Sequence, residues 1–311
     1  MKLKAIMLAT VMSLGMIHVA SAMDVIDWDK DPTLSRIVKD KKIILGVRKT
    51  SAPMSSLVKT ETGEKKYEGL AVDLCMKTVD ELKKKVPDLK VEFFEVDSKT
   101  RIQAVKEGKI DLECGSTTNN NKRQSDVNFS VPYFVSSVMA VTLKTNPLDS
   151  LENFQHGVLV YTKGTTTQKV VEDYFKGVAV TLMKAKNKDY GTNVVYGDDH
   201  QQSFDMLAQH KADIFVNDEV LITGLINTSK DKTIYKMLRD RMSVEPYGIM
   251  SRKDSQITKI VDDVIVTSFK DGSFQNLWDK WLPGVKPSRT MADYIRQCRI
   301  ISAETCKTTA W

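Results

Sequence analysis

The chain has 311 residues, of which 41% are hydrophobic and 28% are charged, and its formal net charge is +6. This length suggests two domains, and the composition supplies ample material for a buried core. The positive charge lies in mixed-sign stretches such as DELKKKVPDLK, so it does not support nucleic-acid binding. The sequence has only four histidines and no Cys/His spacing of the zinc-binding kind, so it does not predict a metal site.

The N-terminus has the three parts of a secretory signal peptide. Lys2 and Lys4 form a basic start, AIMLATVMSLGMI is an uncharged apolar core, and ASA (20–22) is a small-residue cleavage site. No second apolar run approaches the roughly 20 residues of a membrane-spanning helix. The sequence therefore predicts that residues 1–22 are removed near Ala22 and that the mature chain is periplasmic. The alternative is an uncleaved membrane anchor.

The chain has four cysteines, Cys75, Cys114, Cys298 and Cys306. In an exported protein, an even number of cysteines favours disulfides. Cys298 and Cys306 are close in the sequence, which predicts a local bridge between them. Cys75 and Cys114 either pair or remain as buried thiols.

The first half of the chain alternates strands and helices. Strands are predicted over 41–48, 89–96 and 109–115, and helices over 67–86 and 99–108. This order is typical of a parallel sheet with helices packed on its faces.

The second half repeats the alternation between two extended runs. A strand, glycine turn and helix are predicted over 156–175, a strand over 178–185, a helix, turn and strand over 200–218, and helices over 254–282. The flanking extended runs, near 135–143 and 243–251, suggest two α/β lobes joined by two hinge strands. The first lobe is expected to be discontinuous and to comprise residues 23–137 and 248–311, and the second lobe to comprise residues 138–247.

Six motifs carry a resemblance that covers nearly the whole mature chain. They are GVRKTSAP (46–53), DSKTRI (97–102), ECGSTTNNNKRQ (113–124), KGTTT (163–167), DDHQQSF (198–204) and NDEVL (217–221). On these motifs the chain resembles the periplasmic solute-binding family of polar amino-acid ABC importers, and within it the glutamate/aspartate-binding subgroup. The resemblance implies an α/β, type II periplasmic binding protein fold. It also implies a monomer, without cofactor or catalysis, that delivers L-glutamate or L-aspartate to a membrane permease.

The motif after the third strand supplies donors for a carboxylate. Arg123 has a planar fork suited to this group. Ser116 and Thr118 alternate along an extended chain, so their hydroxyls point the same way. A helix cap could explain the hydroxyl and amide residues, but it leaves Arg123 unexplained. The resemblance assigns Arg123 to the ligand α-carboxylate.

The second lobe supplies groups for both ends of an amino acid. Thr165 and Thr166 lie where a helix begins, and exposed N–H groups at a helix start favour an anion. A plain helix cap is the simpler interpretation, and the resemblance adds the carboxylate contact. Asp218 ends a strand, where aspartate is usually a turn former. The resemblance assigns Asp218 to the ligand ammonium.

An acidic ligand needs more positive charge than a neutral one. Arg48 and Arg101 are the candidates for the side-chain carboxylate, although arginines at such places often form exposed ion pairs of little energetic value. Ser98 and His200 complete the positions that resemble the acidic-ligand subgroup. A lone histidine, however, is more often structural.

Two other functions remain open from the sequence. An enzyme on the same fold, such as a periplasmic dehydratase of a cyclic amino acid, would need a general acid, for which Glu113, Glu219 and Asp218 are the nearby carboxylates. A sensor domain of a signalling receptor is the third hypothesis. The sequence contains no Ser/His/Asp order, P-loop or nucleophile elbow.

Overall fold

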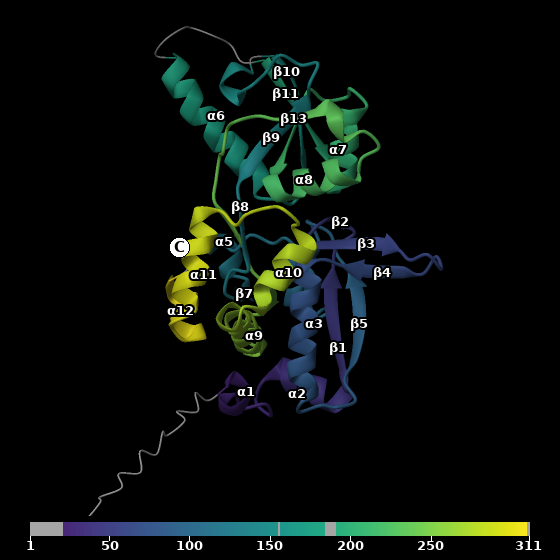
Figure 1. The fold of residues 1–311 in the computed structure, drawn as a ribbon, viewed down its shortest axis with the longest axis vertical. Coiled ribbons are helices and arrows are strands. Elements are labelled where there is room, and N and C mark those ends of the chain that lie inside the picture. Colours follow the sequence, from purple (N-terminus) through teal and green to yellow (C-terminus); the bar gives the residue numbers. More distant parts are fainter. Residues whose placement is uncertain (1–20, 155, 184–190, 310–311) are drawn as a thin grey trace, which may run out of the picture.

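Two α/β lobes joined by a pair of crossing strands make up the fold in the computed structural model (Figure 1), as the sequence predicts. The structure describes residues 21–154, 156–183 and 191–309. Nearly all of the predicted signal peptide lies outside these residues.

The first lobe is built on a five-stranded sheet of order β5-β1-β6-β15-β7. Its strands are β1 (Lys42–Val47), β5 (Lys90–Glu95), β6 (Leu112–Glu113), β7 (Val127–Phe129) and β15 (Met250–Arg252). Strand β1 is parallel to β5 and β6, whereas β15 is antiparallel to β6 and β7. Strand β15 therefore joins this sheet after the chain has passed through the second lobe.

Helices cover both faces of this sheet. The helices of this lobe are α1 (Ala22–Val25), α2 (Pro32–Asp40), α3 (Leu70–Lys83), α4 (Arg101–Lys106), α5 (Asn121–Gln124), α9 (Ile257–Asp271), α10 (Ser273–Trp281), α11 (Arg289–Cys298) and α12 (Ala303–Thr309), of which α1, α11 and α12 pack against α9. Successive strand residues point to opposite faces, so Leu45 packs in the core that contains α3 and α9, whereas Ile44 packs with α4. Gly272 ends α9 with a φ of 81°, which glycine adopts without steric cost.

The second lobe has its own five-stranded sheet, of order β11-β10-β12-β9-β13. Its elements are β9 (Val138–Leu143), β10 (His156–Thr162), β11 (Gly191–Gly197), β12 (Ile214–Asp218), β13 (Tyr235–Met237), α6 (Thr167–Met183), α7 (His200–Ala208), α8 (Glu219–Thr228), and the 3-10 turns η1 (Leu151–Asn153) and η2 (Lys232–Ile234). Met139 and Val141 face α7 and α8, whereas Val138 and Ala140 face α6. This lobe is therefore also a sheet between two helical layers.

Two short strands connect the lobes. Strand β8 (Phe134–Ser136) leads into the second lobe, β14 (Glu245–Tyr247) leads back, and the two pair antiparallel with Glu245 opposite Ser136. Strand β8 overlaps the start of the extended run predicted near 135–143, most of which forms β9 of the second lobe. Strand β14 lies within the run predicted near 243–251. Figure 1 shows β8 between the two sheets.

Both pairs of cysteines form disulfides. The predicted bridge between Cys298 and Cys306 is confirmed, with Cα atoms 5.2 Å apart, and it joins α11 to α12. Cys75 pairs with Cys114, with Cα atoms 6.2 Å apart, so it ties α3 to the end of β6. The second pairing settles the alternative that the sequence leaves open.

Two features differ from the prediction. The strand predicted over 178–185 is wrong, because α6 continues to Met183 and the next described strand is β11. A small antiparallel sheet of β2 (Thr50–Ser51), β3 (Ser55–Lys59) and β4 (Lys65–Glu68) precedes α3 and was not predicted. The helix predicted over 67–86 therefore begins at Leu70, after β4.

Candidate functional site

The predicted site residues come from both lobes and gather where the lobes face each other. Arg48, Ser98, Arg101, Ser116, Thr118, Arg123, His200 and Asp218 are buried, and Thr165 and Thr166 are half-buried. The structure adds two buried carboxylates, Glu113 and Glu245. We call the charged members of this set, with its serines and His200, the interlobe polar cluster: Arg48, Ser98, Arg101, Glu113, Ser116, Arg123, His200, Asp218 and Glu245.

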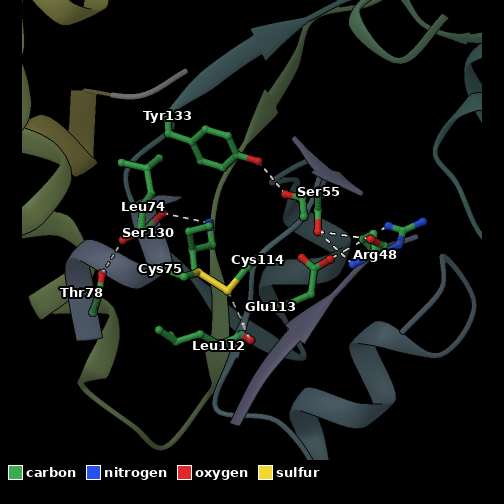
Figure 2. The surroundings of a disulfide bond; sticks show 12 residues. Arg48, Ser55, Leu74, Cys75, Thr78, Leu112, Glu113, Cys114, Ser130 and Tyr133 are labelled. Atoms are coloured by element: carbon green, nitrogen blue, oxygen red, sulfur yellow. Dashed lines mark hydrogen bonds and ion pairs between the residues drawn. A yellow bond between two sulfur atoms is a disulfide. The ribbon is translucent and has the colours of Figure 1, made fainter. Parts of the chain in front are cut away.

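The end of β6 carries Glu113 of the cluster, next to the disulfide of Cys114 (Figure 2), and Ser116 follows two residues after Cys114. Cys114 is fixed by its disulfide to α3, and the Tyr133 hydroxyl donates to the Gly115 carbonyl at 2.6 Å. Thr118 then pairs with Tyr247 of β14 as an isolated antiparallel bridge. The chain from Cys114 to Thr118 is therefore held at both ends, and Ser116 lies within it.

Arg48 follows β1 and is held by three groups of its own lobe. Its backbone N–H donates to Ser55 Oγ at 2.9 Å, its Nη2 donates to Ser98 Oγ at 2.7 Å, and its Nη1 lies 4.0 Å from Glu113 Oε1. Burial and repulsion from Arg101 lower the pKa of Arg48 to about 10, and Glu113 opposes that shift. Arg48 therefore stays charged at neutral pH.

Arg101 and Arg123 bring two further buried positive charges. Arg123 Nη1 donates to the Thr118 carbonyl at 2.8 Å, and its backbone N–H donates to Asn120 at 3.0 Å. Burial and repulsion from Arg101 lower the pKa of Arg123 to about 9. Burial also lowers the pKa of Arg101, against the attraction of Glu113 and Asp218.

Asp218 is the carboxylate that β12 of the second lobe contributes to the cluster. It is the last residue of β12, and its Oδ2 accepts a hydrogen bond from the Tyr247 hydroxyl. Burial and the nearby Glu245 raise the pKa of Asp218 to about 7, although the Tyr247 hydrogen bond, Arg123 and Arg101 oppose the shift. The carboxyl group of Asp218 is therefore only partly ionised at neutral pH.

His200 is a neutral hydrogen-bond donor at the start of α7. Its Nδ1 lies 3.0 Å from both Thr162 Oγ1 and Asn217 Nδ2. The amide nitrogen of Asn217 can only donate, so Nδ1 accepts and Nε2 carries the proton. Burial, Arg48 and Arg101 hold the pKa of His200 well below its usual value.

The threonines before α6 use their hydroxyls within the protein. Thr165 donates to the Thr162 carbonyl at 2.8 Å, and Thr166 donates to Glu245 Oε2 at 3.0 Å. The groups that these residues can offer to an anion are therefore the backbone N–H groups of the helix start, which have no partner inside the helix. The preceding Gly164 has a φ of 76°, and a Cβ there would lie 2.7 Å from the Ser98 carbonyl oxygen of the first lobe.

Buried polar atoms without a hydrogen-bond partner concentrate in this cluster. Within the described part of the chain they include Arg48 Nη1, Arg101 Nε, Glu113 Oε1, Ser116 Oγ and Asp218 Oδ1, and also Ser136 Oγ and Ser137 Oγ beside β8. Leaving such a group unpaired costs about 1–3 kcal/mol, and more for a charge. Buried donors and acceptors of both charges without a hydrogen-bond partner therefore lie between the lobes.

The sequence reasoning missed the residues of the crossing strand. Glu245 and Tyr247 are two apart in β14, so both point to the same side. From the sequence, the stretch SVEPYG (243–248) indicates only an extended run. An acidic and an aromatic residue at this spacing in a strand that joins two lobes is the signal that could have found them.

Neither a metal site nor a membrane span is found in what the structure describes. No group of three or more His, Cys, Asp or Glu residues among the described residues could hold a metal ion. No helix in the same ranges is long and apolar enough to cross a membrane.

Comparisons with known proteins give a family match and similar relatives. Residues 43–284 match the model of the bacterial extracellular solute-binding proteins, family 3. The chain is 36% identical to the L-glutamate/L-aspartate-binding protein of Pseudomonas aeruginosa over 254 residues, which cover 80% of this chain and 79% of that protein. It is 30% identical to the glutamate/aspartate import solute-binding protein of Escherichia coli K12 over 264 residues, which cover 83% and 82%.

A similar solved structure is that of an ancestral arginine-binding protein bound to arginine. The TM-score is 0.65 with 26% identity, and the match covers 78% of this chain and 98% of that one. The shared fold thus accommodates different amino acids, so the ligand must be argued from the side chains of the site.

Proposed function

Because the chain belongs to family 3 of the bacterial extracellular solute-binding proteins, we propose that it captures L-glutamate or L-aspartate between its lobes. The complex delivers the ligand to the membrane permease of an ABC importer. The protein acts in the periplasm as a monomer and does not transform the ligand.

The three buried arginines are the observation that carries this proposal. An acidic amino acid has two carboxylates and one ammonium, and each must meet an opposite charge when it leaves water. Arg48, Arg101 and Arg123 are all buried, and arginine stays protonated in proteins. Asp218 is buried near them, and burial and Glu245 raise its pKa to about 7. A neutral amino acid would leave one arginine without a ligand partner.

The roles follow from which lobe and which strand end each residue occupies. Arg123 binds the α-carboxylate together with the Ser116 and Thr118 segment and the N–H groups at Thr165 and Thr166. Asp218 binds the ammonium through its free Oδ1.

Arg48 and Arg101 bind the side-chain carboxylate. Ser98 holds Arg48 in place through its 2.7 Å hydrogen bond, and His200 adds its Nε2 proton as a donor.

Binding is proposed to close the lobes. Residues 23–137 and 248–311 form one lobe, residues 138–247 form the other, and β8 and β14 are the hinge. The arginines for the two carboxylates belong to the first lobe, and Asp218 for the ammonium belongs to the second. Neither lobe alone therefore neutralises both charges of an amino acid, so the ligand favours the arrangement in which both lobes reach it. Residues 1–22 are the signal peptide.

Arg101→Met tests the ligand assignment. It removes the charge but keeps much of the apolar length, so L-glutamate affinity should fall far more than L-glutamine affinity in calorimetric titrations. Arg241→Met is the matched control, because Arg241 is an exposed arginine paired with Glu219. An equal loss for both ligands would show that Arg101 is a general scaffold residue and would contradict the acidic-ligand proposal.

A further inference from the structure

Glu113 is a buried carboxylate to which the proposed ligand contacts give no role. It is the last residue of β6 and is fully buried. Its Oε2 accepts from the Thr117 hydroxyl at 2.8 Å, whereas its Oε1 has no hydrogen-bond partner. Figure 2 shows its carboxylate turned toward Arg48, whose Nη1 is 4.0 Å from Oε1.

The surrounding backbone is shaped to keep these two side chains together. A Cβ at Gly115 would lie 2.4 Å from Glu113 Oε1 and 2.8 Å from Arg48 Cγ, so a larger residue there would separate them. The residue between Glu113 and Gly115 is Cys114, which its disulfide to Cys75 fixes to α3. Glu113 therefore has little freedom to turn away from Arg48.

The charges of Arg48, Arg101 and Glu113 do not cancel. Arg48 and Arg101 repel each other, and Glu113 attracts both. Asp97 also attracts both arginines but is partly exposed, and Asp218 also attracts Arg101 but is assigned to the ligand ammonium. Apart from these two, two buried cations and one buried anion leave one excess positive charge, which in a low-dielectric site matches one negative charge better than none or two.

We propose that Glu113 sets the charge selectivity of the side-chain subsite, because it cancels one of the two arginine charges at Arg48 and Arg101. The subsite therefore takes a side-chain group with a single negative charge, and it discriminates against uncharged amides and doubly charged phosphates. This inference rests on the proposed function, since it requires that the two arginines face the ligand side chain.

Glu113→Gln is the direct test, because it removes the charge and keeps the size and an oxygen for Thr117. The probes are L-serine O-sulfate and O-phospho-L-serine, which share one shape and differ in charge. At pH 8 the phosphate carries two negative charges, because its second pKa is about 6. Calorimetry gives the ratio of their dissociation constants in each variant.

Wild-type protein should bind the sulfate ester more tightly than the phosphate ester. In Glu113→Gln this preference should shift toward the phosphate ester by about tenfold or more, because an unmatched buried charge changes discrimination strongly. Thr117→Val is the matched control: it removes the hydroxyl that contacts Glu113 but leaves the charge, so the ratio should stay as in wild type.

If folded Glu113→Gln has a ratio of the two dissociation constants within about twofold of wild type, the inference is overturned. A merely structural role of Glu113 would weaken the binding of both esters alike. If this variant does not fold, the test uses the wild-type protein alone. Wild-type protein that binds the phosphate ester as tightly as the sulfate ester, or more tightly, overturns the inference. Failure of the wild-type protein to bind either L-glutamate or L-aspartate would instead overturn the proposed function, so the two failures are distinguishable.

Discussion

Gly224→Ala should weaken ligand binding without touching the ligand. Gly224 lies inside α8 of the second lobe, and a Cβ there would be 2.2 Å from the Ala52 carbonyl oxygen and 2.8 Å from its carbonyl carbon. Both atoms are backbone of the first lobe, so no side-chain rotation relieves the overlap. An ordinary contact requires the lobes to move apart by about 1 Å.

The size and sign of the effect follow from two opposing terms. Overpacking of this kind costs about 1–3 kcal/mol, and that cost falls on the arrangement in which the lobes touch. It converts to a loss of affinity of about 5- to 140-fold. The same substitution favours the helix by about 0.5–1 kcal/mol, so the ligand-free protein is not expected to unfold more easily.

Calorimetry with L-glutamate measures the loss of affinity caused by the overlap. Thermal unfolding without ligand measures the gain in helix stability. Asn227→Ala is the matched control, because Asn227 is exposed in the same helix and gains helix propensity without a contact to Ala52. An affinity of Gly224→Ala within about twofold of wild type would refute the idea that binding requires the lobes to meet at this contact.

Three further predictions concern charge, pH and the disulfides. Arg123→Ala should weaken L-glutamate binding by about 2–5 kcal/mol in calorimetry while the circular dichroism spectrum stays unchanged, because it leaves a desolvated carboxylate unpaired; near-normal affinity would disprove the α-carboxylate assignment. The pKa of Asp218 is about 7 in the free protein, and the ligand ammonium must lower it, so binding below pH 7 releases a proton and affinity should fall as pH decreases from 7 to 5.5. A constant affinity over this range, measured in one series of titrations, would exclude Asp218 as the ammonium partner. Replacing Cys75 and Cys114 by serine opens a loop with a sequence separation of 39, which should lower the free energy of unfolding by about 4 kcal/mol in denaturant titrations; a loss below about 1 kcal/mol would show that the bridge adds little to stability.

The order of strands and helices was predictable because each element carries its own apolar pattern. The two extended runs also predicted the crossing strands, since neither has helical spacing. The strand prediction over 178–185 is wrong because a short apolar stretch with two valines has strand propensity. Pattern alone does not separate such a stretch from a buried helix segment, and α6 continues through it to Met183.

The site was predictable where a motif carried the chemistry and not where the fold creates the contact. Arg48, Arg123 and Asp218 stand in motifs, and the structure buries all three together. Glu245 lies 79 residues from Thr166, and their hydrogen bond forms because the fold brings β14 next to the start of α6. Nothing local in the sequence indicates that pairing.

The central claim is that the site between the lobes binds an acidic amino acid. Calorimetric titration of the wild-type protein with L-glutamate, L-aspartate, L-glutamine and L-arginine tests it most directly, with the ligand recovered afterwards and checked by mass spectrometry. We expect one molecule of L-glutamate or L-aspartate to bind per chain, at least about tenfold more tightly than L-glutamine, and to be recovered unchanged. Tighter binding of L-glutamine or L-arginine, or conversion of the ligand, would contradict the account.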